Sequence, residues 1–331
     1  MGHDEENAYT EEDVQGQGPE QVQEQTREQD GGTAPEQVQS QSAVTNIRVP
    51  RPPAAHLERN APLGVPTTAR PAPPSFVYAI GRVEPRFPST AIEKELAQAT
   101  RGYSTDGQTD RQALRSVLED RASRYLVRQM CWVFTVEGLE TYVLAPRDPA
   151  DFDLLIETVR AEPDTGDVDV VIGVRGPIVP PEACNGLLVP SVLFEQLYSF
   201  NRDELIGEVP RPDGRDEDQF RATVEELFDR ICQVADNAGA IDQHRALNYL
   251  AVRYPAIYAK AAEAHAAEAS LTGVEVRPSR LSSARTIMDV VFSYTHRRTD
   301  VIEKHFVRVD VTEQFPFLVT KLSPYFDRYE P

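Results

Sequence analysis

Cysteine is scarce in this sequence, and its spacing excludes two common structural uses of the residue. The 331-residue chain has three cysteines, Cys131, Cys184 and Cys232, which lie about fifty residues apart. The number is odd and no two of them form a Cys-x-x-Cys pair, so the pattern is not that of a disulfide framework. No pair of cysteines has the spacing of a zinc finger either. We therefore expect reduced thiols, as in a cytoplasmic protein.

The sequence also lacks long apolar runs and has fewer basic than acidic residues. No run approaches the roughly 18 apolar residues of a membrane helix, and the residues after Met1 lack the basic and apolar regions of a secretory signal. Lysine and arginine number 34 against 53 aspartates and glutamates, a formal net charge of -19. Such a surface repels phosphate backbones and anionic lipids. The composition predicts a cytoplasmic protein that binds neither nucleic acid nor membrane.

The motifs of the common enzyme classes are missing as well. The sequence has no GxxxxGK[ST] loop to hold phosphates, no GxGxxG after a strand, no HExxH and no GxSxG. The separate Asp, His and Ser motifs of a subtilisin-type protease are absent too. These absences argue against the common hydrolases and nucleotide enzymes and favour a protein without catalytic activity. No cofactor is expected.

The first 74 residues contain few large apolar side chains. They are rich in glutamate and glutamine at first and in proline from Pro50 onward. Such a segment cannot bury enough apolar surface to offset chain entropy, about 1–2 kcal/mol per ordered residue. We expect residues 1–74 to form a disordered acidic tail, with recognition of a partner by its prolines as the alternative. The composition changes at Phe76, and residues 75–331 are expected to form a single domain.

Strand and helix patterns are mixed in the rest of the chain and predict an α+β fold with a mixed, mainly antiparallel sheet. β-rich runs at 130–136 and 140–144 flank a short turn, as in a hairpin. The middle segment is helical, because apolar residues between 216 and 237 recur every three or four positions. The end of the chain is predicted to be a β-meander, with strands at 271–277, 287–295 and 303–311.

One segment of the chain gives a mixed signal. Residues 186–199 combine a short apolar run with a proline in the middle. We expect a strand up to Val189 and a helix after Pro190.

Three side chains are candidates for peptide binding: Arg175, Arg277 and Tyr294. Arg175 follows a predicted buried strand, where a guanidinium can meet an acidic ligand or pair with an internal carboxylate. Arg277 and Tyr294 lie in the predicted meander, whose outer strand could accept an extended peptide by strand addition. An edge strand covered by polar side chains is the alternative. Asp167 and Asp169 flank a strand start and are expected to be solvated.

Cys184 is the main candidate for reactive chemistry. It lies in a predicted loop, where a thiol near a histidine can act as a nucleophile. An inert, buried cysteine is the alternative. Zinc bound by the cysteines together with His244, His265 or His305 is a further alternative, although these residues lack finger-like spacing.

Seven runs of sequence carry a family resemblance. They are FVYAIGRVEPRFPS at 76–89, RQMCWVFTVEGLETY at 128–142, DVDVVIGVRGPI at 167–178, ADNAGA at 235–240, RALNYLAVRYPAIY at 245–258, LTGVEVRPSR at 271–280 and VDVTEQFPFLV at 309–319. Together they resemble the C-terminal domain of PatG-type cyanobactin maturation proteases. In that family the domain follows a subtilisin-like macrocyclase and has no established activity. Here it is expected to stand alone, since the residues before Phe76 hold no protease motif.

The resemblance implies a place in the biosynthesis of ribosomally made, post-translationally modified peptides. We expect a non-catalytic accessory domain that binds a precursor peptide or a peptide-modifying enzyme. Two alternatives stay open: an unrecognised enzyme of the same pathway that uses Cys184 or a bound metal, and an assembly domain that mainly forms a homodimer.

Overall fold

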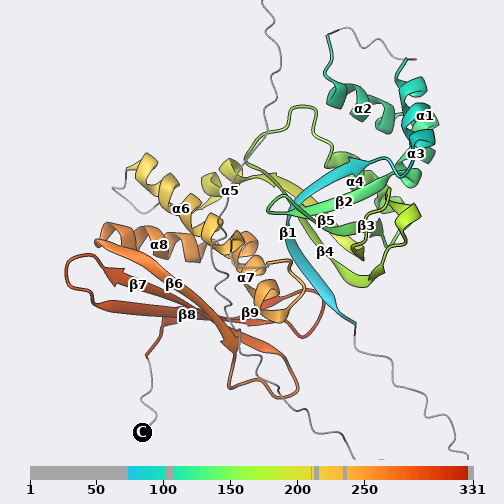
Figure 1. Ribbon diagram of the computed structural model, residues 1–331. Helices are drawn as coiled ribbons and strands as arrows, with labels where there is room; N and C mark the ends of the chain where they lie inside the picture. The colour runs from blue at the N-terminus through green and yellow to red at the C-terminus, as the bar shows by residue number, and fades with distance from the viewer. Residues whose placement is uncertain (1–73, 102–106, 210, 212–215, 234–236, 327–331) are drawn as a thin grey trace, which may run out of the picture. The chain divides into compact units, whose positions relative to one another are not determined.

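The computed structural model describes residues 74–101, 107–209, 211, 216–233 and 237–326, and the structural statements below refer to these residues. The predicted tail lies outside them except for Pro74. Helices and two separate, mostly antiparallel sheets make up the described chain, so the predicted α+β class is confirmed (Figure 1). None of the described helices combines the length and apolar composition that a membrane-spanning helix requires.

The first five strands form a closed barrel in the order β1-β2-β3-β5-β4. Their bounds are Phe76–Arg86 (β1), Cys131–Val136 (β2), Leu139–Pro146 (β3), Asp167–Ile178 (β4) and Pro190–Asn201 (β5). All neighbours are antiparallel except β3 and β5, which run parallel. Helix α4, Phe152–Glu157, lies between β3 and β4 in the chain. This strand order with a helix after the third strand is the topology of an OB-fold.

Strand β1 pairs with two different strands along its length. Its first half pairs with β4 and its second half with β2, and the change comes at Gly81. A Cβ atom at Gly81 would lie 2.1 Å from the carbonyl oxygen of Thr135. The backbone of β2 can approach β1 this closely only because residue 81 has no side chain.

Alternation along β2 separates the inside of the barrel from its outside. Trp132 and Phe134 belong to the apolar core of the barrel. Cys131 and Val133 point the other way, into a second, smaller apolar cluster. This is the two-residue period of a strand, and it places Cys131 on the outer face of the barrel.

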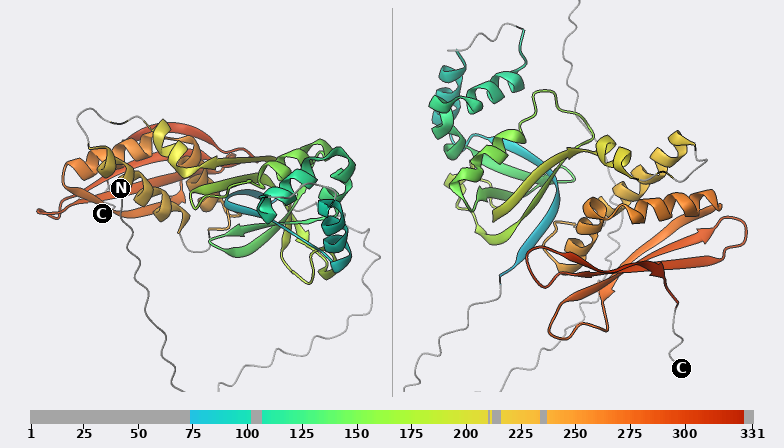
Figure 2. Two further views of the ribbon diagram at one scale, coloured as in Figure 1. Left: turned by 90° about the horizontal axis from the view of Figure 1, so that it is seen from above. Right: turned by 180° about the vertical axis from the view of Figure 1, so that it is seen from behind.

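Helices α1 (Thr90–Arg101), α2 (Asp110–Glu119) and α3 (Arg124–Gln129) lie between β1 and β2 in the chain. Thr109 begins α2 with a capping box, since its side chain and that of Gln112 each accept a hydrogen bond from the other's backbone N–H. Buried apolar residues of all three helices join the barrel core. Figure 2 shows these blue-green helices grouped at one side of the barrel. Short 3₁₀ turns occur at Arg121–Ser123, Pro149–Asp151 and Pro181–Ala183.

The C-terminal part has four helices and a four-stranded antiparallel meander in the order β6-β7-β8-β9. The helices are α5 (Arg202–Glu208), α6 (Glu217–Cys232), α7 (Asp242–Arg253) and α8 (Ala256–Ala266). The strands are β6 (Ala269–Pro278), β7 (Ile287–His296), β8 (Ile302–Asp310) and β9 (Phe317–Pro324). In Figure 1, α7 and α8 lie over one face of this sheet. Alternate residues of β7, from Met288 to Tyr294, share a core with these helices.

Polar groups of α7 and of the residues just before it form hydrogen bonds with the backbone of β1. The Asn248 side chain donates to the Tyr78 carbonyl oxygen at 2.8 Å and exchanges hydrogen bonds with Asn237. Gly239 accepts a 2.9 Å hydrogen bond from Tyr78 N–H, and a Cβ at Gly239 would lie 2.3 Å from the Tyr78 carbonyl oxygen. Buried backbone groups of β1 are thereby satisfied.

The prediction for residues 186–199 was wrong on both sides of Pro190, because residues 186–189 form no strand and lie in the loop before β5. The segment from Pro190 is the long strand β5, in which Val192, Phe194 and Leu197 are buried. A register shift adds one residue between Phe194 and Gln196. The bulge turns the two-residue period into a two-then-three spacing, which resembles the spacing of a helix. Strand β9 was not predicted.

Candidate functional site

The four-stranded sheet leaves two strand edges open, whereas the closed barrel leaves none. On β6, the N–H of Ser279 donates to the Ile287 carbonyl oxygen at 2.8 Å. Hydrogen-bonded pairs alternate along an antiparallel ladder, so Arg277 and Glu275 also turn their backbone groups toward β7. Val274 and Val276 therefore turn their N–H and C=O groups away from β7, to the open edge.

At both ends of this β6 edge, a backbone group that an added strand would need is missing or already hydrogen-bonded. Pro278 has the next outward position and carries no N–H. At the other end the Leu271 carbonyl oxygen accepts a hydrogen bond from Arg230 of α6. On the opposite edge of the sheet, Tyr254 accepts a 2.9 Å hydrogen bond from the N–H of Leu322 in β9. The open edge of β6 is thus a short, defined stretch around Val274 and Val276.

Arg277 lies on the face of the sheet that α7 and α8 do not cover. Its guanidinium stacks over the ring of Tyr325, 4.9 Å from the centroid, and also donates a hydrogen bond to the Tyr325 hydroxyl. Glu275 lies 3.6 Å away on the same strand. The hydrogen bond to Tyr325 raises the pKa of Arg277. Arg277 therefore flanks the open β6 edge, and it already has partners within the sheet.

Two neighbouring strands carry a second charged pair on this face. Arg308 of β8 donates to Asp289 of β7 at 2.9 Å and stacks over the ring of Phe306. Asp289 is also the register partner of Arg277. This row of arginines and aromatic rings was not predicted from the sequence. Alternation along the meander could have found it, because each member lies on the opposite side from the core residues.

Tyr294 lies in the core, with only 2% of its surface exposed. Burial raises the pKa of its hydroxyl. The residue contributes to the wall of a pocket of about 360 Å³ that Lys260, Glu263 and Glu303 also line. Tyr294 thus faces the helices, on the opposite side of the sheet from Arg277, and the structure does not bring the two candidates together.

Arg175 belongs to the barrel and not to the meander. It is exposed on β4, and its backbone N–H donates to the Ser75 carbonyl oxygen at 2.8 Å. The neighbouring acids of β4 differ from the expectation of solvated carboxylates. Asp169 is 1% exposed and accepts from Val83 N–H at 2.7 Å and from the Ser199 hydroxyl at 2.6 Å.

Arg160 is the charged partner of both buried carboxylates. Its guanidinium lies 3.3 Å from Asp169 and 3.4 Å from Asp167. Burial nevertheless raises the pKa of Asp169. These carboxylates hold β1, β4 and β5 together, which is a structural role.

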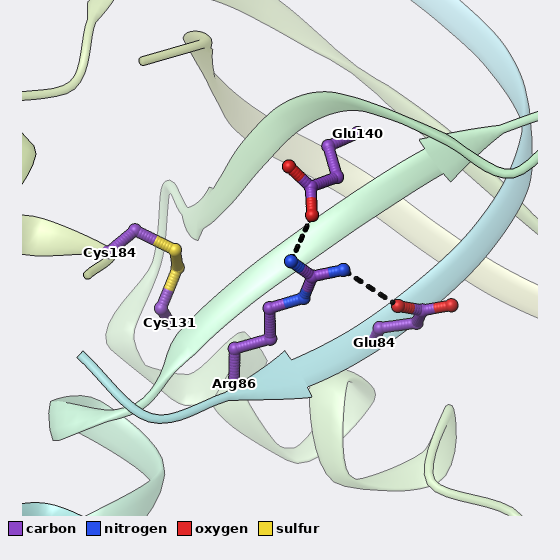
Figure 3. Close-up of a disulfide and its surroundings, with 5 residues drawn as sticks. All are labelled: Glu84, Arg86, Cys131, Glu140 and Cys184. Atoms are coloured by element: carbon purple, nitrogen blue, oxygen red, sulfur yellow. Dashed lines mark hydrogen bonds and ion pairs between the residues drawn. A yellow bond between two sulfur atoms is a disulfide. The ribbon is translucent and has the colours of Figure 1, made fainter. Parts of the chain in front are cut away.

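The expectation of reduced thiols is wrong for two of the three cysteines. Cys131 and Cys184 form a disulfide, with their Cα atoms 5.4 Å apart (Figure 3). They are 53 residues apart in sequence, and only the fold of the β4–β5 loop over β2 makes them neighbours. Cys184 in this state has no thiol to serve as a nucleophile or as a zinc ligand.

Cys232 is the free cysteine, on the last turn of α6. Burial raises the pKa of its thiol to about 12, so the reactive thiolate is suppressed. Among the described residues, no three His, Cys, Asp or Glu side chains are grouped closely enough to hold a metal ion.

Comparisons with known proteins agree with the resemblance seen in the sequence. Residues 214–325 match the model of the family described as PatG C-terminal. A solved structure titled "PatG Domain of Unknown Function" is similar in fold, with a TM-score of 0.63 and 20% sequence identity. The match covers 76% of this chain and 98% of that one. The comparison with curated proteins found no significant match. The resemblance to the PatG C-terminal domain is therefore confirmed, and the family model places it in residues 214–325.

Proposed function

We propose that this protein is a non-catalytic accessory module that binds an extended segment of another polypeptide along the edge of β6. The partner would be a precursor peptide, or a peptide-modifying enzyme, of a pathway like that of the cyanobactins. The observation that carries the proposal is the outward backbone pair at Val274 and Val276 on the edge of an otherwise completed sheet. The family match supports the setting.

Strand addition at this edge can form about four backbone hydrogen bonds. At about 0.5–1.5 kcal/mol each, these give weak binding without sequence preference. Side-chain contacts must supply the rest of the affinity. Arg277 is placed for this role, because alternate side chains of an added strand would lie beside Glu275 and Arg277 on the uncovered face. The proposal assigns no such contact to Arg175 or Tyr294.

A proline scan of β6 tests the proposal, with a precursor peptide of a cyanobactin pathway as the probe. Val276→Pro removes an outward N–H and leaves the ladder to β7 intact. Glu275→Pro removes an inward N–H and is the matched control for damage to the sheet. Titration calorimetry on the full chain should show binding lost in Val276→Pro with only a small fall in melting temperature. Unchanged affinity would remove β6 from consideration.

A second measurement tests the charge on the uncovered face and the absence of catalysis. Arg277→Glu should weaken peptide binding at least tenfold while the circular dichroism spectrum stays the same. Mass spectrometry of the peptide after incubation with the native chain should show an unchanged mass, and elemental analysis should show no stoichiometric zinc. A modified peptide would replace this proposal with the enzyme alternative. A dimer in light scattering that Val276→Pro dissolves would favour the assembly alternative.

A further inference from the structure

The outer face of β2 and β3 is covered, although strands on the outside of a barrel usually meet solvent. Val133 points away from the barrel core and is 0% exposed. The residues that cover it come from the β4–β5 loop, 179–189: Cys184 and Leu187 pack against Val133 and Val143. Figure 3 shows Cys184 of this loop beside Cys131 of β2. The loop that joins β4 to β5, the neighbour of β3, thus lies across the outer face of β2 and β3.

This loop is folded on itself and is attached to the face by few groups. Its backbone closes internally, with Gly186 N–H donating to the Pro181 carbonyl oxygen at 2.7 Å and Val179 N–H donating to that of Val189 at 3.0 Å. Asn185 and Gly186 take positive φ angles of 47° and 89°, which form the tight tip. The described attachments to β2 and β3 are the Cys131–Cys184 disulfide and the small apolar cluster around Leu187.

A pocket of about 640 Å³ lies beside the loop tip. Its walls are the end of β1, the start of α1, Glu140 of β3 and residues 184–187 of the loop. Arg86 lies at its edge and bridges Glu140 and Glu84, the latter at 3.2 Å (Figure 3). Glu93 of α1 also lines the pocket. Arg86 is thus paired with Glu84 and Glu140, while Glu93 and Glu140 line the pocket, so the local charge is negative and favours a cationic ligand group.

OB-folds bind oligonucleotides and oligosaccharides on the face of strands 2 and 3, with the β1–β2 and β4–β5 segments on either side. Here both flanking segments line the pocket, and β3 contributes Glu140 to it. We propose that the outer face of β2 and β3 is a binding face for an extended peptide with apolar and basic side chains. Loop 179–189 is its cover, and the Cys131–Cys184 disulfide is the latch. The net charge of -19 and the pocket carboxylates disfavour a nucleic acid in this place.

The latch opens by thiol–disulfide exchange with a dithiol reductant. Two electrons and two protons pass from the reductant, the bond between the two cysteine sulfurs breaks, two thiols form, and the reductant becomes a disulfide. Without the bond, the loop is attached mainly through Leu187, so it can leave Val133 and Val143.

The test compares the full chain in its oxidised and reduced forms. The probe is a fluorescein-labelled octapeptide of alternating valine and lysine, followed by fluorescence anisotropy. A valine–glutamate octapeptide and an eight-nucleotide oligothymidine are the comparison ligands. We expect the lysine peptide to bind at least tenfold more tightly after reduction, and the affinity of the other two probes not to change on reduction. Hydrogen exchange of the amides in β2 and β3 should speed up in parallel.

Variants separate the parts of the proposal. Cys131→Ala/Cys184→Ala should bind without reductant, and the reduced native chain gives the same answer should that variant fold poorly. Glu93→Gln/Glu140→Gln should lose the lysine peptide while the loop still opens. Val276→Pro should keep the redox-dependent binding, which distinguishes this site from the β6 edge.

Three results would overturn the proposal. Equal affinity before and after reduction would mean that loop 179–189 is not a cover. Absence of peptide binding in every form would mean that the face is not a binding face. Tighter binding of the oligothymidine than of the lysine peptide would assign the face to a different ligand class.

Discussion

The barrel and the four-stranded sheet differ in how the backbone hydrogen-bonding groups of their strands are paired. Both are antiparallel for the most part, and each buries one set of alternate side chains. The barrel closes on itself and satisfies its backbone groups internally, so a ligand can reach only side chains on its outer face. The meander stays open at β6, where Val274 and Val276 leave backbone groups for a partner. The two regions therefore predict two kinds of recognition in one chain.

The largest expected effect lies in the closed barrel. Asp169→Ala removes a buried carboxylate that Val83, Ser199 and Arg160 all contact, and should reduce the free energy of unfolding by about 3–5 kcal/mol. Asp289→Ala on the open sheet removes a partner of Arg308 and should reduce it by about 1–3 kcal/mol. Urea denaturation measures both. Equal losses would contradict the view that the barrel depends more on its buried polar groups.

Loss of the disulfide should cause the second largest fall in the free energy of unfolding. Its removal in Cys131→Ala/Cys184→Ala is expected to lower the free energy of unfolding by about 2–4 kcal/mol, because it closes a long loop in the unfolded chain. Cys232→Ala is the matched control and should change stability by less. Thermal unfolding with and without reductant gives the same comparison in the native chain. Insensitivity to reductant would show that the bond adds no stability.

A pair of arginine substitutions compares the two regions directly. Arg277→Ala loses the stacking and the hydrogen bond to Tyr325 and should cost about 1 kcal/mol. Arg175→Ala, on the exposed surface of the barrel, should stay within about 0.5 kcal/mol of the native value. The reverse order in urea denaturation would show that Arg175 has a structural partner.

The smallest expected effect is a pH dependence in the open sheet. Burial, and then Lys260, lower the pKa of His305, whereas Glu303 and Glu263 oppose the shift. As the pH falls below about 6.5, the unfolded state takes up a proton that the folded state does not, so stability decreases. Below the lowered pKa the decrease stops. His305→Gln should flatten this part of the stability curve, and an unchanged curve would assign it to other groups.

The sequence predicted elements with a strong local period far better than those without one. The helix from Glu217 and the strands β7 and β8 came from clear periods of 3.6 and 2. The 186–199 segment was assigned wrongly, because residues 186–189 lie in the loop before β5 and a bulge near Glu195 breaks the two-residue period of β5. The three candidate residues differ in their surroundings: Arg175 is exposed on β4 of the barrel, Arg277 lies on the uncovered face of the meander, and Tyr294 lies in the core between the meander and the helices. Register and strand order decide which residues are neighbours, and neither can be read from composition or spacing.

The amino-acid sequence by itself determined the acidic charge, the α+β class, the meander and the resemblance to the PatG C-terminal domain, because these follow from composition and local pattern. Only the tertiary structure decided that the first sheet closes into a barrel, that Cys184 meets Cys131, and that β6 ends as an open edge. The physical reason is that closure, disulfide pairing and edges are long-range contacts. They bring together residues many positions apart, and no local preference of the chain encodes them.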